Sequence, residues 1–331
     1  MRAFRRIAGF LLLLAIAAGG IFYWNPLWVN DEVIRYHLWR SNVRSEYVEA
    51  GGYRLHYFEA FPPDGSPGVP LLLVHGLGSR GEDWSPMIPS LAAAGFHVYA
   101  PDLLGFGRSA KPDVAYSLPL EEGVVVSFLD AIHLQHADVG GWSMGGWVAA
   151  ALAIDHPQRV DRLVLYDSLA LKFDPTIAQD AFVPTDAASL YRLIDVLSPQ
   201  PRILPGFVIR ATLRKLHRNG WIIQRTMDSI FTFKDALDGR IEAIRQPTLV
   251  VWGSEDHLIP LAVGEATHRD IAGSDLVIIQ GCGHLAPGEC PKPVLASTIQ
   301  FLKAQPPMQG GEESLPGTAQ GGLTPATEEA R

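Results

Sequence analysis

The chain has 331 residues, of which 47% are hydrophobic and 19% are charged, and its formal net charge is −8 at pH 7. This apolar content is enough for a buried core, so we expect one folded domain of roughly 250 residues with an appendage. The acidic balance excludes a broad basic face, and we therefore expect no nucleic-acid partner. The two cysteines are too few for a disulfide framework or a zinc site.

Residues 1–30 have the composition of a membrane-spanning segment. Arg2, Arg5 and Arg6 precede an uncharged, mostly apolar run from Ile7 to Asn30 that ends among aromatic residues. A helix needs about 20 apolar residues to cross the hydrocarbon layer. We expect an uncleaved anchor with the arginines in the cytoplasm and the rest of the chain outside it. Cleavage as a signal peptide near Ala15-Ile16-Ala17, which would release a secreted protein, remains the alternative.

Beyond the anchor, strand patterns alternate with helix patterns. Residues 31–47 are charged and aromatic and are interpreted as a juxtamembrane segment, while Gly51-Gly52 predicts the turn of a hairpin spanning 48–59. Continuous apolar runs then predict strands at Val69–Val74, Phe96–Ala100, Ala137–Gly140, Arg162–Tyr166, Thr248–Trp252 and Leu276–Ile279. Helix-length segments separate most of these runs. This alternation is typical of a mostly parallel α/β sheet with helices on both faces.

One interval interrupts the alternation. Residues 172–245 contain helical patterns at 187–197, 207–216 and 221–231 but no strand pattern. Structureless loops of this length are rare in compact domains. We interpret the interval as a helical cap that divides a core of residues 48–171 and 246–303. Residues 304–331 are rich in Gln, Gly, Pro, Thr and Glu and are predicted to be a disordered tail.

The sequence Gly141-Trp142-Ser143-Met144-Gly145 lies between a predicted strand and a predicted helix. A serine on a sharp strand-to-helix turn is held in a strained conformation that exposes its hydroxyl, and the flanking glycines let the strand and the helix approach. The start of the helix adds free N–H groups and the positive end of its dipole. We therefore predict that Ser143 is a nucleophile.

Two partners for this serine follow it in the chain. Asp256 comes directly after one buried strand and His284 after the next. Residues just past the carboxyl ends of parallel strands converge on one edge of the sheet. We predict that His284 is the general base and that Asp256 orients its imidazole, in the order serine, acid, histidine. Glu255 is interpreted as a solvated neighbour of the acid.

A serine nucleophile also needs N–H donors for the oxyanion. We predict the backbone N–H of Met144, the residue after the nucleophile, and that of Leu77, in the loop after the first core strand. In the same region, His75 is interpreted as structural, and Asp102 and Arg108 are expected to hold the turn after their strand. Because this chemistry is complete in itself, no metal or organic cofactor is expected.

Several stretches together resemble the α/β-hydrolase superfamily over about Val48 to Lys303. They are His75-Gly76-Leu77-Gly78, Asp102-Leu103-Leu104-Gly105-Phe106-Gly107-Arg108-Ser109, the turn at Ser143, Gly253-Ser254-Glu255-Asp256 and Gly283-His284. The resemblance implies an eight-stranded, mostly parallel sheet with an inserted cap. With its N-terminal anchor, the chain most resembles membrane-anchored monoacylglycerol lipases and related esterases. Epoxide hydrolases and haloalkane dehalogenases are similar but place a carboxylate where this chain has Ser143.

The serine favours acyl transfer, and ester hydrolysis is the leading interpretation. An anchor beside a cap suggests a small apolar ester, such as a monoacylglycerol, delivered from the membrane. An acyltransferase, a C–C bond hydrolase and a peptidase share the same triad and stay open, as does a non-catalytic binding module on a hydrolase scaffold. Cys282 and Cys290 lie on either side of His284, and we expect two unpaired thiols, with pairing outside the cytoplasm as the alternative.

Overall fold

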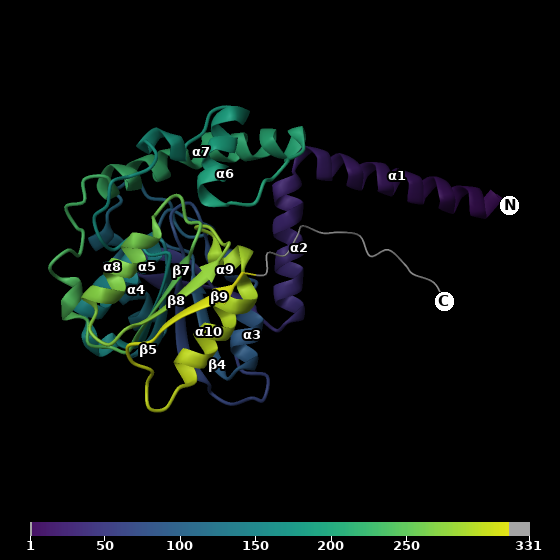
Figure 1. Cartoon of the computed structure of the whole chain (residues 1–331). Helices are drawn as coiled ribbons and strands as arrows, with labels where there is room; N and C mark the ends of the chain where they lie inside the picture. Colours follow the sequence, from purple (N-terminus) through teal and green to yellow (C-terminus); the bar gives the residue numbers. More distant parts are fainter. Residues whose placement is uncertain (1, 318–331) are drawn as a thin grey trace.

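The computed structural model describes residues 2–317, and its centre is a nine-stranded sheet (Figure 1). The strands run in the order β1-β2-β4-β3-β5-β6-β7-β8-β9. β1 pairs with β2 and β2 with β4 in antiparallel fashion, and the other pairings are parallel. The strands are β1 (Arg44–Ala50), β2 (Tyr53–Ala60), β3 (Val69–Val74), β4 (Phe96–Pro101), β5 (Ala137–Trp142), β6 (Val160–Tyr166), β7 (Thr248–Gly253), β8 (Asp275–Gln280) and β9 (Glu312–Pro316).

The strands predicted from apolar runs are present, with ends that differ from the prediction by at most two residues. β7 is buried along its whole length and β3 from Leu71 to Val74, because both faces of the central part of the sheet are covered. The sheet has one strand more than the eight that we expected, and the additional strand is β9 at its edge.

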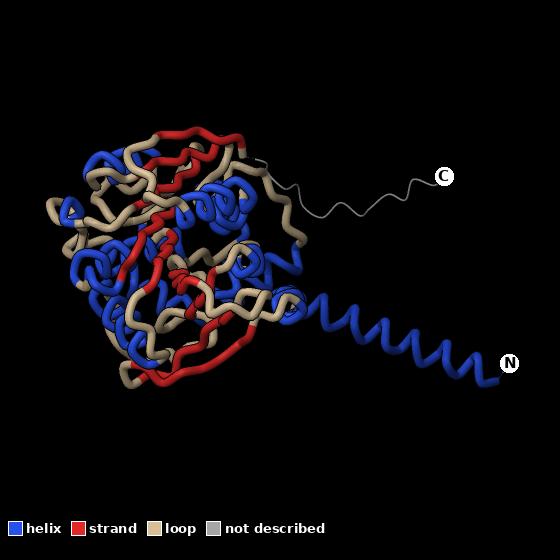
Figure 2. The backbone as a smooth tube through the Cα atoms, turned by 90° about the horizontal axis from the view of Figure 1, so that it is seen from below, coloured by secondary structure: helices blue, strands red, loops and turns tan. Residues whose placement is uncertain are grey.

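Helices cover both faces of this sheet, as Figure 2 shows. On one face, α4 (Leu118–Ala131), α5 (Met144–Asp155) and α8 (Leu261–Asp270) pack into a common core with the strands. On the other face, α3 (Ile88–Ala93) and α10 (Pro291–Lys303) form a second core. Short helical turns lie at Gly81–Trp84, Pro157–Arg159, Gln179–Phe182, Ile241–Ala243 and α9 (Ala286–Glu289). The mostly parallel α/β architecture predicted from the sequence is confirmed.

The N-terminal segment forms a long helix, α1 (Arg2–Trp24), that projects away from the body of the protein (Figure 1). Its part Arg6–Trp24 has a mean hydropathy of 2.1 and none of it is buried, so it is long and apolar enough to cross a membrane. A signal sequence has the same features. A second helix, α2 (Pro26–Arg40), begins directly after it, with proline in the first helical turn, where the missing N–H has no cost.

The juxtamembrane segment expected at residues 31–47 is divided between two elements. The helical part begins earlier, at Pro26, and ends at Arg40, while Arg44 to Tyr47 belong to β1. Leu38 of α2 is buried in the second core, which attaches the helix to the domain. β1 is longer than predicted because Arg44 pairs with Glu59 across the hairpin.

The cap contains α6 (Ala187–Leu197) and the longer α7 (Gly206–Ile230), which lie over one end of the sheet (Figure 1). We predicted separate helical segments at 207–216 and 221–231, whereas α7 is continuous through Gly220. The structure gives this glycine a packing role, since a Cβ at position 220 would lie 2.6 Å from the Cγ1 of Val183. The first part of α7 meets α1, where Arg210 donates to the hydroxyl of Tyr23 at 2.9 Å.

The tail prediction was wrong for part of its length. Residues 312–316 form β9, which pairs in parallel with β8 from Leu276 to Gln280. Leu315 is the one partly buried residue of this edge strand. The strand is held at the edge of the sheet by the backbone hydrogen bonds of its pairing with β8. The rest of the predicted tail, residues 318–331, lies outside the described residues.

Candidate active site

Ser143 occupies the turn between β5 and α5, at the carboxyl edge of the sheet. Its backbone has a φ of 56° and a ψ of −122°, a combination that non-glycine residues rarely adopt. The conformation is held from several sides, because its N–H donates to Tyr166 O at 2.9 Å and its carbonyl accepts from Gly146 and Leu169. Strain of this kind persists only where the surroundings determine it, as at a nucleophile turn.

The glycines around Ser143 are required by close packing. A Cβ at position 141 would lie 2.2 Å from Gly145 O, and one at position 145 would lie 2.3 Å from Val74 O. Real Cβ atoms do not approach backbone oxygen this closely, so a larger residue at either position would push α5 away from the strands. The glycines on either side of Ser143 therefore allow the close approach of strand and helix that we predicted for a nucleophile turn.

Ser143, His284 and Asp256 form a hydrogen-bonded chain. His284 Nε2 lies 2.9 Å from Ser143 Oγ, and His284 Nδ1 lies 2.8 Å from Asp256 Oδ2. All three residues are buried, with exposed fractions of 8%, 3% and 5%. Trp142 Nε1 donates to the carbonyl of His284 at 2.8 Å and so fixes the loop that carries the histidine. This arrangement matches a nucleophile, a base and an acid that orients the base.

The carboxylate that faces His284 belongs to Asp256 and not to the adjacent Glu255. Asp256 Oδ1 accepts from the N–H groups of Leu258 and Ile259, both at 2.9 Å, which leaves Oδ2 for the imidazole. Glu255 has a half-exposed side chain, 3.6 Å from His257. The interpretation of Glu255 as a solvated neighbour agrees with this position.

Leu77 and Met144 both line a cavity at Ser143, where the oxyanion of an acyl-transfer reaction would form. A Cβ at Gly76 would lie 3.0 Å from Ser143 Cβ, so the loop that carries Leu77 passes directly over the nucleophile. Met144 is the first residue of α5, and helices leave their first N–H groups without intrahelical partners. Within residues 2–317, neither N–H donates a hydrogen bond. Both donors are therefore available to a ligand.

His75 and Asp102 hold the neighbouring loops. Leu103 N donates to His75 Nε2 at 2.9 Å, and burial lowers the pKa of this histidine, so it is neutral with its proton on Nδ1. Asp102 is buried too, and it accepts from the N–H groups of Gly81 and Arg108, each at 2.7 Å. These contacts fit the structural roles that we expected.

A second buried carboxyl beside the acid was not predicted. Asp167 follows β6 with a φ of 42°, is fully buried, and accepts from Gly253 N at 2.8 Å. Burial raises the pKa of Asp167, and the negative charge of Asp256 raises it further. The sequence could have indicated Asp167 as a site residue, because it follows a buried strand directly, as Asp256 and His284 do.

The cysteine expectation was wrong. Cys282 and Cys290 form a disulfide, with their Cα atoms 6.4 Å apart. The short helix α9 between them reverses the chain and returns Cys290 to the side of Cys282, within the normal range of a disulfide. The bridge closes the segment that carries His284.

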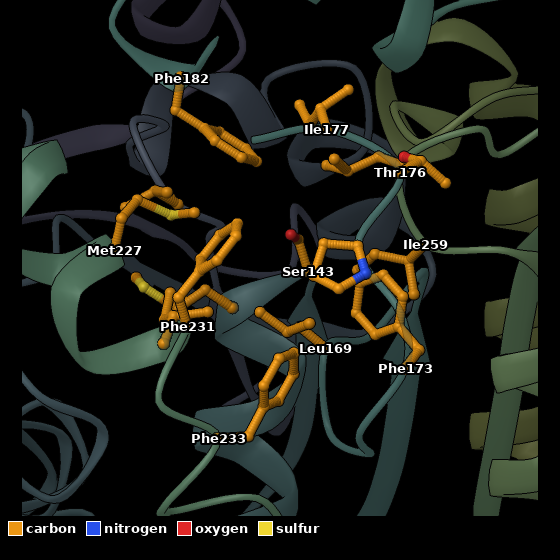
Figure 3. A pocket seen from close by; sticks show the side chains of 15 residues that line it. Ser143, Leu169, Phe173, Thr176, Ile177, Phe182, Met227, Phe231, Phe233 and Ile259 are labelled. Carbon is orange, nitrogen blue, oxygen red and sulfur yellow. The ribbon is translucent and has the colours of Figure 1, made fainter. Parts of the chain in front are cut away.

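An apolar cavity, hereafter the acyl cavity, opens directly at Ser143. Figure 3 shows the serine hydroxyl pointing into it, among side chains from the core and the cap. The empty space at this site is about 480 Å³, part of it open to solvent. Its lining, which the sequence does not predict, comprises Leu77, Met144, Leu169, Phe173, Pro175, Thr176, Ile177, Phe182, Met227, Ile230, Phe231, Phe233, Leu258 and Ile259.

A second cavity, hereafter the middle cavity, lies on the other side of the nucleophile. It is lined by Ser143 and His284, by Trp142, and by cap residues that include Leu216 and Ile223. The acyl and middle cavities share Leu77, Ser143, Phe182 and Leu258. Ser143 therefore stands where the two spaces meet.

With the fold and the site established, similarity to known proteins can be judged. Residues 71–297 match the family described as "Alpha/beta hydrolase family", which is more than half of the chain. The chain belongs to this family. The sheet topology, the turn at Ser143 and the triad-like geometry agree with that membership.

The chain is similar to hydrolases of several kinds. The 2-hydroxymuconate semialdehyde hydrolase of Pseudomonas sp. (strain CF600) is 35% identical over 243 residues, covering 67% of this chain and 82% of the relative. Lipase 1 of Psychrobacter immobilis is 28% identical over 278 residues, covering 79% and 85%. The crystal structure of a membrane phospholipase A, described as a bacterial virulence factor, has a TM-score of 0.77 and 26% identity, covering 90% of this chain and 97% of the other.

Proposed function

We propose that this hydrolase cleaves carboxylic esters of apolar acyl chains, such as monoacylglycerols, through an acyl-enzyme on Ser143. The observation that carries the proposal is the acyl cavity at the end of the Ser143–His284–Asp256 chain, whose lining is almost entirely apolar. An acyl chain gains about 0.8 kcal/mol for each methylene that it buries there. Similarity to Lipase 1 supports the same substrate class.

Catalysis follows from the distances in the site. His284 Nε2 takes the proton of Ser143 Oγ, 2.9 Å away, while Oγ attacks the carbonyl carbon. The carbonyl oxygen becomes an oxyanion and accepts from the N–H groups of Leu77 and Met144. The C–O bond to the alcohol then breaks, and His284 gives its proton to the leaving oxygen. Water attacks the acyl-enzyme by the same steps, and the carboxylic acid leaves.

The N-terminal segment supports delivery of the substrate from a membrane. We infer that α1 anchors the protein, with the arginines in the cytoplasm and the catalytic domain outside it. The end of α1 contacts the cap, where Phe22 and Phe207 have ring centroids 5.4 Å apart. Retention of an intact N-terminus in carbonate-washed membranes would support the anchor, whereas a mature N-terminus after residue 17 in the soluble fraction would show a cleaved signal peptide.

The test of the activity compares wild type with Ser143→Ala on p-nitrophenyl esters of increasing chain length. We expect hydrolysis that rises with chain length in wild type and is lost in the variant. Labelling by a fluorophosphonate probe provides a second readout, because it needs the nucleophile and the base but no particular substrate. A chain that is labelled at Ser143 yet cleaves no ester would retain the nucleophile and refute ester hydrolysis.

C–C bond hydrolysis is the second candidate. The 35% identity to 2-hydroxymuconate semialdehyde hydrolase favours it, and the same residues would serve as nucleophile and base. Parallel kcat/KM measurements on that relative's named substrate and on octanoyl esters separate the two. A preference for the semialdehyde would replace the ester proposal.

A further inference from the structure

A third cavity lies beside the junction of α1, α2 and the cap. Arg80 and Lys111 from the core, Lys215 from α7 and Leu27 from α2 all line it, and it is called the basic cavity below. It holds about 870 Å³ of empty space, part of it open to solvent. Polar groups from Thr212 and Asn219 of α7 complete its wall.

Two of the three cations have no bound anion. Arg80 donates to both carboxylate oxygens of Asp31, at 3.0 and 2.5 Å, and lies 3.0 Å from Glu82, so its charge is compensated. Lys111 Nζ donates to three backbone carbonyls, those of Phe106, Gly107 and Ser109, at 3.3, 2.7 and 3.3 Å, so all three of its donors are used although its charge has no anionic partner within residues 2–317. Lys215 has no hydrogen-bond or ion-pair partner among the residues that the structure describes, although it is half-buried on α7.

The electrostatics of the lysines agree with binding of an anion in this cavity. Burial lowers the pKa of Lys215, and the charge of Arg80 adds to this effect, while Asp31, Asp83 and Glu82 oppose it. Burial also lowers the pKa of Lys111; the charge of Lys215 adds to this effect and that of Asp102 opposes it. Since the positive charge of Lys215 lies near those of Arg80 and Lys111, an anion in this cavity would relieve the repulsion among them.

The basic cavity continues toward the nucleophile. It shares Gly78, Leu216 and Ile223 with the middle cavity, which Ser143 and His284 line. The middle cavity in turn meets the acyl cavity at Ser143. The three connected cavities therefore offer one elongated ligand an apolar space, a position for its ester at Ser143 and a cationic space, in that order.

The anchor places the cationic end near the membrane interface. Leu27 lies three residues beyond Trp24, the last residue of α1, and Arg214 donates to the carbonyl of Trp24 at 2.9 Å. If α1 spans the bilayer, residues at its aromatic end lie at headgroup level. Phosphate groups of lipids are concentrated at that depth, and Lys binds phosphate as a point charge.

We propose that Lys215 binds the phosphate of a lipid headgroup, that the charge of Lys111 adds to the attraction, and that the preferred ester is a glycerophospholipid or lysophospholipid whose acyl chain enters the acyl cavity. This inference rests on the proposed ester hydrolysis and names its substrate class. Thr212 and Asn219 offer further donors on the same helix, α7.

Substrate selectivity provides the first test. The full chain in neutral detergent micelles is assayed on lauroyl lysophosphatidic acid and on monolauroylglycerol, which share the acyl chain and the glycerol and differ only in the phosphate. We expect the ratio of their kcat/KM values to favour the phospholipid in wild type and to fall at least tenfold in Lys111→Gln/Lys215→Gln. Lys292→Gln is the matched control, because Lys292 is an exposed lysine on α10 and lines none of the three cavities. An equal loss on both substrates, or an unchanged ratio, overturns the phosphate site.

Binding measured without catalysis provides the second test, and it separates failure of this site from failure of ester hydrolysis. Glycerol 3-phosphate is titrated calorimetrically into the full chain and its variants. We expect binding to wild type and to Lys292→Gln that weakens at least tenfold in the double lysine variant, even if no ester is cleaved. Inorganic phosphate is the other ligand. If it binds as tightly as glycerol 3-phosphate and the phospholipid is not preferred, the cavity is a site for free phosphate and the lipid assignment is wrong. If neither ligand binds to wild type, the proposal fails.

Discussion

Reducing the acyl cavity should change the chain-length preference of the enzyme. Ile177 lines this cavity from the cap and is half-buried, so a larger side chain there can be accommodated without repacking the core. Figure 3 shows its side chain on the cap side of the Ser143 hydroxyl. We expect Ile177→Trp to occupy space that the distal part of a medium acyl chain uses in wild type.

The expected change in kcat/KM follows from the apolar lining of the acyl cavity. Where the walls are apolar, each methylene that enters contributes at most about 0.8 kcal/mol, or about fourfold in kcat/KM. Extending a p-nitrophenyl ester from butyrate to octanoate therefore raises kcat/KM by up to about 200-fold in wild type. Ile177→Trp should lose at least tenfold more kcat/KM on octanoate than on acetate, because only the longer chain reaches position 177.

The assay measures kcat/KM for the acetate-to-decanoate series in wild type, Ile177→Trp and Ile203→Trp. Ile203 is a matched control in the same cap, since it is 95% exposed and lines none of the described cavities near Ser143. The reasoning is refuted if wild-type kcat/KM does not rise between acetate and octanoate, or if Ile177→Trp retains the wild-type slope. An equal change in both tryptophan variants would indicate a general effect of the cap.

Three further predictions concern the triad, the disulfide and a buried carboxyl. Asp256→Asn should lower kcat by about 10⁴ with a small change in KM, because the amide favours the wrong imidazole tautomer; activity within tenfold of wild type would exclude this role. Replacing Cys282 and Cys290 by Ala should lower the free energy of unfolding by about 2.5 kcal/mol, from the loss of a short closed loop, as measured by denaturant titration; reduced wild type is the control. Glu121 is buried on α4, and burial raises its pKa to about 8 from an ordinary value of 4.5. The unfolded chain loses this proton first, so the folded state loses stability as the pH rises from about 4.5 to about 8. Glu121→Gln should remove that loss, on the order of 3 kcal/mol by pH 7, whereas Glu242→Gln, an exposed control, should not; identical pH dependence in Glu121→Gln and wild type would contradict the assignment.

The sequence by itself determined the features that short segments specify. Apolar runs located the six strands β3 to β8 to within two residues. Strands that are covered on both faces have a local composition that does not depend on their partners. The five residues around Ser143 identified the turn, since the glycines that permit its close packing lie next to the serine. The order of Ser143, Asp256 and His284 predicted that they would meet, because parallel strands end at one edge.

Only the tertiary structure decided features that depend on distance in space. Asp256 faces His284 while Glu255 faces His257, a choice that depends on the loops after β7 and β8 and not on composition. The pairing of Cys282 with Cys290 depends on the reversal of the chain at α9. The pairing of β9 with β8 depends on a contact in space, and the weakly apolar residues of β9 do not predict it. The acyl and basic cavities combine residues of the core, the cap and α2, and the sequence does not encode their shape locally, because it arises from the packing of segments that lie far apart in the chain.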